Sequence, residues 1–205
     1  MSVAALESPP LRRFAVPPEP VLPLTVGQYH AMIRAGELES GSPIELLEGW
    51  LVTKMIKNPP HSASTAKTRR CLNGLLPVGW SVDSQEPVTT PDSEPEPDVA
   101  VIRGLREDYV DRHPGPKDVG VLVEVADASL DRDRSWKKRI YAAAGIPVYW
   151  IVNLVDRQIE VFTRPSGPSD RPDYGTCQIY LPGNEVPVVL DANELGRIAV
   201  HDLLP

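Results

Sequence analysis

This 205-residue chain has the composition of one globular domain with a modest extension, because 41% of its residues are hydrophobic and 24% are charged. Its net charge of −7 argues against a broadly basic nucleic-acid surface, but not against a metal-dependent nuclease, in which clustered acids add negative charge. No apolar run reaches the roughly 20 residues of a membrane span. No apolar block of the signal-peptide type stands at the N-terminus, so we expect a cytoplasmic protein without a membrane partner.

Residues 1–23 are rich in proline, which interrupts any helical pattern and permits only extended or polyproline segments. This composition predicts a flexible arm. A single domain is then expected over residues 24–205.

The first elements of that domain are predicted to be a helix and a hairpin. Thr25 and Gln28 have the form of a capping box, which predicts the start of a short helix. The apolar-rich arms of 44–55 flank Glu48-Gly49, a pattern typical of a β-hairpin with a tight turn.

A second helix is predicted over 61–76, with Pro77 as its end. Alternating apolar and polar residues then predict a strand over 79–87. Residues 103–118 are rich in Gly, Pro and charge and are expected to form a surface connection.

The most informative stretch is Val121–Ala126, where five of six residues are apolar and Glu124 is the exception. Such a run is typical of a strand buried on both faces. A carboxylate there loses its solvation, and burying it without a partner is costly. We therefore expect a metal or a cation against Glu124. Asp98 opens another predicted buried strand, over 98–102, and is the candidate for a second acid.

The helix after this strand is expected to supply the cation, and its apolar side is formed by Trp136, Ile140, Ala143 and Ala144. Lys137 falls at roughly 60° from the centre of that side and Lys138 at roughly 160°, so Lys137 is better placed to reach Glu124. Asp133 points towards the same side near the helix start. It is either an acid favoured in a first turn or a participant in the site.

Further strands are predicted over 148–153 and 157–162, with shorter ones near 177–181 and 186–190. The mixed order of elements indicates an α/β or α+β domain with a central sheet and a helix crossing behind it. The sequence contains no Gly-rich phosphate loop, nucleophile elbow or His-Glu-x-x-His motif, which excludes the enzyme classes that those motifs define.

Glu45 and His61 each have two interpretations. Glu45 is either a carboxylate on a strand surface or a ligand that completes a metal site. His61 directly follows two prolines at a helix start, where it either caps the helix or sits in solvent, or else contacts phosphate.

Several of these motifs together resemble the Uma-type ("Uma-two") restriction endonuclease family of the PD-(D/E)XK nuclease superfamily. The motifs are Pro97-Asp98, Glu124 within Val-Glu-Val, Asp133-Arg134, Lys137 and the run Tyr141–Val152. The segments Glu45–Gly49 and Pro59–His61 also resemble the opening hairpin and helix of that family. The resemblance covers about residues 24–204.

The resemblance implies a restriction-endonuclease-like core, in which a four-stranded mixed sheet is flanked by helices, with an N-terminal helix and extra hairpins. It also implies that Asp98, Glu124 and the carbonyl of Val125 hold Mg²⁺, with Mn²⁺ as a substitute. The superfamily places its lysine two residues after the second acid, where this chain has Ala126. The resemblance suggests that the lysine has moved to the next helix as Lys137.

The function implied is hydrolysis of DNA phosphodiester bonds, with Lys137 stabilising the nucleophile or the developing charge. Glu45 could complete a second metal position and His61 could contact phosphate. One alternative is a catalytically inactive module with the nuclease fold that binds DNA or protein. Another is an interaction protein, such as a homodimer formed through exposed strands of 148–162.

Overall fold

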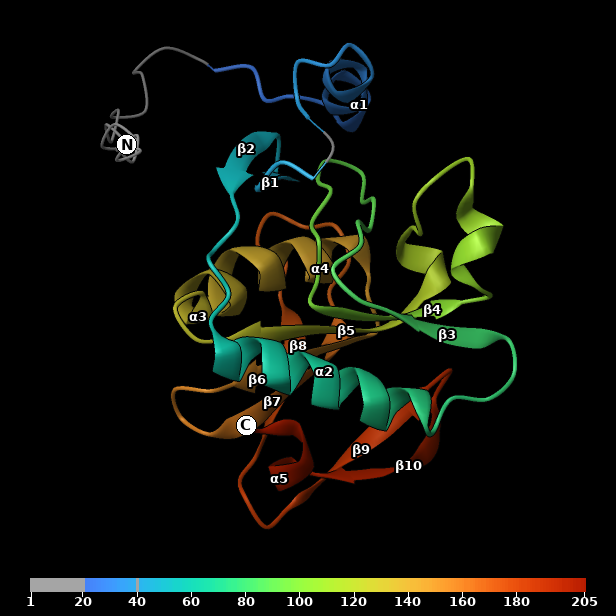
Figure 1. The fold of residues 1–205 in the computed structure, drawn as a ribbon, viewed down its shortest axis with the longest axis vertical. Coiled ribbons are helices and arrows are strands. Elements are labelled where there is room, and N and C mark those ends of the chain that lie inside the picture. The colour runs from blue at the N-terminus through green and yellow to red at the C-terminus, as the bar shows by residue number, and fades with distance from the viewer. Residues whose placement is uncertain (1–20, 40) are drawn as a thin grey trace, which may run out of the picture.

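The computed structural model describes residues 21–39 and 41–205 (Figure 1). Most of the predicted arm at 1–23 therefore lies outside the described residues. No helix in the described ranges is long and apolar enough to cross a membrane.

The centre of the domain is a six-stranded mixed sheet in the order β3-β4-β5-β6-β7-β8 (Figure 1). Its strands are β3 (Trp80–Asp83), β4 (Val99–Arg103), β5 (Val119–Ala126), β6 (Val148–Asn153), β7 (Gln158–Pro165) and β8 (Tyr174–Tyr180). The β5–β6 pair is parallel and the other four pairs are antiparallel. The predicted mixed α/β fold is confirmed, although the sheet has six strands rather than the four implied by the resemblance.

The two faces of the sheet are covered by different helices. One face carries Val121, Val123 and Val125 of β5 and packs with Leu72 of α2 (Pro59–Asn73). The opposite face carries Leu122 and packs with Ile140 and Tyr141 of α4 (Lys138–Ala144). All eight residues of β5 are buried, which confirms the prediction that this strand is covered on both sides.

The crossover from β5 to β6 contains a π turn that the sequence did not reveal. It runs through α3 (Leu130–Arg132), the π turn η3 (Asp133–Lys137) and α4, and it ends at Gly145, whose φ of 76° is in the left-handed region. Within η3, the N–H of Lys138 donates to the carbonyl of Asp133, so the turn holds one residue more than an α-helical turn.

The buried side of this crossover differs in part from the predicted apolar side. The buried residues of η3 and α4 are Asp133, Lys137, Ile140, Tyr141 and Ala142, while Trp136 and Ala144 are partly buried and pack against the core. Asp133, Lys137, Ile140 and Tyr141 have the spacing of one helix side. Lys137 therefore lies within the buried side rather than at its border.

The hairpin and the first helix agree with the sequence analysis. The helix α1 (Val26–Arg34) begins at the predicted capping box, and β1 (Ile44–Leu47) and β2 (Trp50–Thr53) turn at 48–49. Gly49 has a φ of 79°, and a Cβ there would lie 2.3 Å from the Cβ of Pro23, so only glycine fits.

The second helix and the third strand have other bounds than predicted. The helix α2 starts at Pro59, is capped by the side chain of Asn58 and ends at Asn73, before the predicted stop at Pro77. The strand β3 covers only 80–83 of the predicted 79–87. Two 3-10 turns, η1 (Arg106–Tyr109) and η2 (Pro116–Asp118), occupy the predicted surface connection.

The C-terminal part corrects two further expectations. Besides β8, it forms the hairpin of β9 (Glu185–Leu190) and β10 (Asn193–Ala199), followed by α5 (Val200–Leu203), where the sequence predicted only two short strands. The strands β6 and β7 have a partner on each side. They are therefore not exposed edges, and the reason given for a homodimer through 148–162 is wrong.

Candidate functional site

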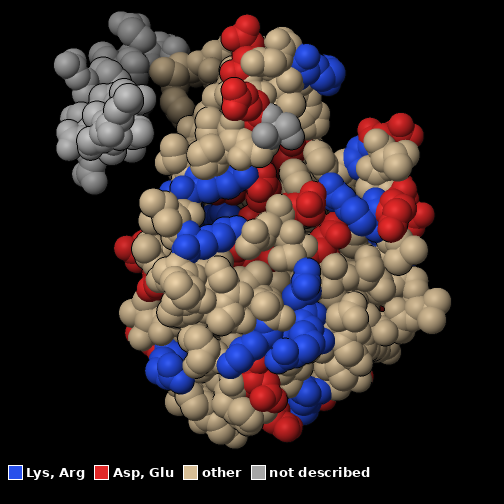
Figure 2. Space-filling view, in the orientation of Figure 1, with Lys and Arg blue, Asp and Glu red and all other residues tan. Residues whose placement is uncertain are grey.

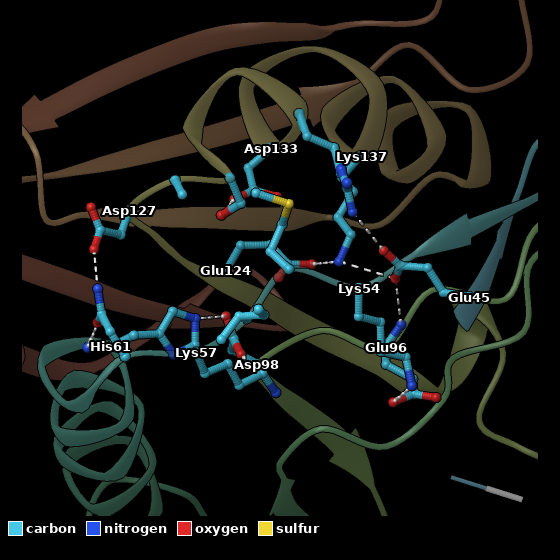
Figure 3. Close-up of a pocket in the computed structure, with 16 residues that line it drawn as sticks. Glu45, Lys54, Lys57, His61, Glu96, Asp98, Glu124, Asp127, Asp133 and Lys137 are labelled. Atoms are coloured by element: carbon cyan, nitrogen blue, oxygen red, sulfur yellow. Dashed lines mark hydrogen bonds and ion pairs between the residues drawn. The ribbon is translucent and has the colours of Figure 1, made fainter. Parts of the chain in front are cut away.

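A cavity of about 70 Å³ opens at the edge of the sheet where β4 begins and β5 ends (Figure 3). The two strands are antiparallel and pair Val99 with Val123, which places Asp98, just before β4, beside the end of β5. The hairpin, the start of α2 and the α3–η3 segment complete the walls. The residues that line the cavity are Glu45, Lys54–Asn58, His61, Glu96, Asp98, Glu124, Asp127–Ser129, Arg132, Asp133 and Lys137.

Asp98 is almost fully buried and has two short polar contacts and one longer ion pair. Its Oδ2 accepts a hydrogen bond from the N–H of Val125 at 2.9 Å and lies 3.0 Å from Nε2 of His61. Its Oδ1 lies 3.6 Å from Nζ of Lys57. Burial opposes ionisation, but the contacts with His61, Val125 and Lys137 outweigh it and lower the pKa of Asp98. Asp98 is therefore a carboxylate at neutral pH.

Glu124 and Lys137 form a buried ion pair, as Figure 3 shows. Nζ of Lys137 lies 2.9 Å from Oε1 of Glu124 and 3.3 Å from Oε2 of Glu45. The hydroxyl of Tyr141 also donates to Oε1 of Glu124, at 2.7 Å. The ammonium predicted against Glu124 is thus present, and it comes from the π turn of the crossover.

The cavity contains more acid than base among its lining residues, since six carboxyl groups face four lysine and arginine side chains. Burial, with the nearby charges of Asp133 and Asp98, raises the pKa of Glu124 to about 8 against the opposing effect of Lys137. Burial likewise raises the pKa of Asp133 to about 6. Burial would lower the pKa of Lys137, but Glu124, Glu45 and Asp133 outweigh it, so the pKa is raised and the ammonium stays charged.

The two interpretations of Glu45 and His61 can now be compared with their positions. Glu45 is only 2% exposed and faces Lys137 and Arg132, so it is not a strand-surface carboxylate. His61 is buried against Asp98, while Asn58 caps the helix, so it is neither the cap nor in solvent. Both side chains line the same cavity as Asp98.

Asp133 also lies in this cavity rather than at an exposed helix start. It is 2% exposed, and its Oδ2 accepts a hydrogen bond from Oγ of Ser129 at 2.6 Å. The hydroxyl of Tyr149 donates to its backbone carbonyl at 3.1 Å, which helps to hold the π turn.

Three basic residues at the mouth of the cavity were not predicted from the sequence. Lys54 and Lys57 follow the hairpin, and Arg132 comes from α3. Lys54 is ion-paired with Glu96 at 2.5 Å, and Arg132 lies 3.5 Å from Glu45. The sequence does contain a hint, because Lys54 and Lys57 follow a hairpin whose first strand carries Glu45. The direction in which these lysine side chains point, however, depends on the path of the chain after β2.

The carboxylates of this cavity are a suitable ligand set for a hard divalent cation. Oxygen donors are the ligands that Mg²⁺ and Mn²⁺ prefer. Six carboxyl groups face four lysine and arginine side chains there, so the cavity can accept a further positive charge. The residues therefore fit a bound divalent ion.

Comparisons with known proteins bear on the family and the fold of this chain. The sequence profile of the Uma2 family, described as "Putative restriction endonuclease", matches residues 26–199. A crystal structure described as a putative nuclease belonging to DUF820, from Anabaena variabilis ATCC 29413, is similar with a TM-score of 0.60 and 15% sequence identity. The similarity covers 88% of this chain and 97% of that chain, and at this identity it shows a shared fold. No curated protein matches the chain.

Proposed function

This chain belongs to the Uma2 family of putative restriction endonucleases, and on that premise we propose that it is a metal-dependent endonuclease that hydrolyses DNA phosphodiester bonds. The observation that carries the proposal is the buried group of Asp98, Glu124 and Lys137 at one cavity. Buried acids with perturbed pKa values that lie beside a lysine are found more often at functional sites than in ordinary protein cores. A single domain over residues 24–205 would carry this activity.

In this proposal Asp98 and Glu124 hold Mg²⁺ or Mn²⁺, with the carbonyl of Val125 as a further ligand. Glu45 and Asp133, which line the same cavity, are the proposed accessory carboxylates. When bound, the ion polarises the scissile phosphate and lowers the pKa of a bound water. Asp98 is already ionised before the metal binds, whereas Glu124 must lose a proton to bind the metal at pH values below about 8.

Lys137 is the side chain that supplies positive charge to the proposed reaction. Its ammonium is held between Glu124 and Glu45, so it is already oriented before substrate arrives. From there it stabilises an attacking hydroxide or the charge that develops on the phosphate oxygens. His61 positions Asp98 through their 3.0 Å contact and lies close enough to the mouth to meet phosphate.

The surface around the cavity supports DNA as the substrate. Figure 2 shows Lys and Arg side chains gathered on this face, over α2 and beside the hairpin, although the chain is acidic overall. Arg69 and Arg70 of α2 are exposed, and Lys54 and Lys57 lie at the mouth. Phosphate contacts from such residues position a duplex without reading its sequence.

The metal affinity should depend on pH in a defined direction. The pKa of Glu124 is raised to about 8 and that of Asp133 to about 6, so protons compete with the cation below these values. We expect the affinity for Mn²⁺ to rise by about tenfold per pH unit over part of the range between about pH 6 and pH 8, with proton release on binding. Calorimetry in buffers of different ionisation enthalpy measures both quantities. An affinity that stays constant over this range would contradict the proton competition.

The direct test of the proposed function is a Mn²⁺ and Mg²⁺ titration of the wild type beside Glu124→Gln, followed by cleavage assays on plasmid and linear DNA. Glu160→Gln is the matched control, because Glu160 is an equally buried carboxylate that is paired with Arg134 outside the cavity. We expect metal binding and metal-dependent cleavage in the wild type and the control, and loss of both in Glu124→Gln. Metal binding without cleavage of any DNA would favour the inactive module, which the absence of a lysine at position 126 also favours.

A further inference from the structure

A second group of metal-type side chains lies away from the carboxylate cavity. His30 of α1, Glu94 of the loop between β3 and β4, and His113 of the segment after η1 each offer one ligand atom, and these atoms all lie within 4.8 Å of one another. None of the three lines the cavity of Asp98 and Glu124. They come together from three separate segments, and nothing in the proposed nuclease reaction uses them.

The closest contact in this group joins His30 and Glu94. Nε2 of His30 lies 2.9 Å and 2.7 Å from the two carboxylate oxygens of Glu94. The side chain of Glu94 is only 3% exposed, whereas that of His30 is 32% exposed. A nearly buried carboxylate is thus aimed at an imidazole that is open on one side.

Hydrogen bonds outside the group hold Glu94 in place. Oγ1 of Thr89 donates to Oε2 of Glu94 at 2.6 Å, and the N–H of Glu94 donates to the carbonyl of Leu46 at 2.7 Å. The N–H of Thr89 donates to the carbonyl of Pro114 at 2.9 Å, which fastens the segment of His113 to the same loop. Metal ligands are commonly oriented by such outer hydrogen bonds.

His113 can join the group at the expense of one weak contact. Nη2 of Arg106 lies 3.4 Å from Nδ1 of His113, while shorter contacts of 2.9 Å and 3.3 Å tie that guanidinium to Glu86 and Asp83. Ligation through either ring nitrogen removes the long contact, because ligation by Nε2 places the proton on Nδ1.

We propose that His30, Glu94 and His113 form a second metal site, which binds a Zn²⁺-type ion rather than Mg²⁺. Two imidazoles and one carboxylate suit Zn²⁺, whereas the carboxylate-rich cavity of Asp98 and Glu124 suits Mg²⁺. With metal–ligand distances of about 2.0–2.2 Å, a tetrahedral ion separates nitrogen and oxygen ligands by about 3.3 Å, so His30 and Glu94 need to part by only about half an ångström.

The surroundings of the group define its fourth position and its effect on the fold. A neighbouring cavity of about 550 Å³ is lined by His30, Glu94 and His113 together with Tyr109 and Arg112, and it leaves room for water on the ion. The ion fastens α1 to the loop that leads on to Asp98, because His30 belongs to the helix and Glu94 to the loop. Binding therefore raises the melting temperature of the whole chain.

The test is a calorimetric titration of Zn²⁺ into full-length protein in a background of millimolar Mg²⁺, with His113→Ala as the main variant. This variant keeps the contact of His30 with Glu94 and removes one ligand. Since loss of an outer hydrogen bond alone costs about 10- to 100-fold in affinity, loss of a ligand should weaken Zn²⁺ binding by at least about 100-fold. His201→Ala is the matched control, because His201 is a highly exposed histidine outside the group.

The expected result is one tight Zn²⁺ site in the wild type, His201→Ala and Glu124→Gln, and its loss in His113→Ala and in Glu94→Gln. Zn²⁺ should also raise the melting temperature of the wild type but not of His113→Ala, whose melting temperature without Zn²⁺ shows whether it folds. Three results would overturn the proposal. They are unchanged Zn²⁺ binding in His113→Ala, loss of Zn²⁺ binding in Glu124→Gln instead, and no Zn²⁺ binding in the wild type.

Discussion

Replacing Asp98 with asparagine should lower the rate of DNA cleavage by at least about 10³-fold while the protein stays folded. The change keeps an oxygen that can accept from the N–H of Val125, but it removes the negative charge proposed to hold the metal. Metal-ion catalysis contributes several kcal/mol of transition-state stabilisation, and about 4 kcal/mol corresponds to about 10³-fold in rate. Initial rates at saturating Mg²⁺, beside thermal melting followed by circular dichroism, measure both parts of the prediction.

The matched control for this change is Asp83→Asn. Asp83 ends β3, the strand next to β4, and is ion-paired with Arg106 outside the cavity. We expect its cleavage rate to remain close to that of the wild type. Cleavage retained by Asp98→Asn would place the active site elsewhere in the chain.

Replacing Lys137 with methionine should lower the free energy of unfolding by about 3–5 kcal/mol above about pH 8, where Glu124 is ionised. The ammonium is the charge shared by Glu124 and Glu45, and its removal leaves these buried carboxylates uncompensated. Methionine occupies a similar volume, so the loss comes from charge rather than from packing. Urea unfolding in the presence of EDTA measures the change.

The pH dependence of this variant follows from the raised pKa of Glu124. A carboxyl group whose pKa is higher in the folded than in the unfolded state binds more protons when folded, so stability falls as pH rises between the two values. Without Lys137 the folded pKa is higher still. The variant should therefore recover stability as pH falls, and millimolar Mg²⁺ should restore part of it above about pH 8 by replacing the missing charge.

Lys138→Met provides the comparison at the neighbouring position. Lys138 pairs with the exposed Asp173 at 2.8 Å, and exposed ion pairs contribute about 0–1 kcal/mol. A loss in Lys137→Met that is no larger than in Lys138→Met would show that the buried acids do not depend on this ammonium.

The parts of the fold that were predicted correctly rest on local patterns. The capping box at Thr25, the hairpin turn at Glu48-Gly49 and the buried strand of Glu124 each depend on residues within a few positions of one another. The expectation that a cation lies against Glu124 followed from the cost of burying a carboxylate, and the structure places Lys137 there.

The parts that were missed depend on contacts between distant segments. His30 and Glu94 are 64 residues apart, and no spacing rule joins a helix residue to a loop residue at that distance. The directions of Lys54 and Lys57 depend on the path from β2 to α2. The π turn at 133–137 depends on tertiary bonds such as that from the hydroxyl of Tyr149 to the carbonyl of Asp133.

The buried side of the β5–β6 crossover changes from polar to apolar along its length. Asp133 and Lys137 lie four residues apart, a spacing at which helical residues are neighbours, and both line the cavity. Ile140 and Tyr141 continue the same side and pack into the apolar core of the sheet. One short segment thus serves the polar cavity and the apolar core at once.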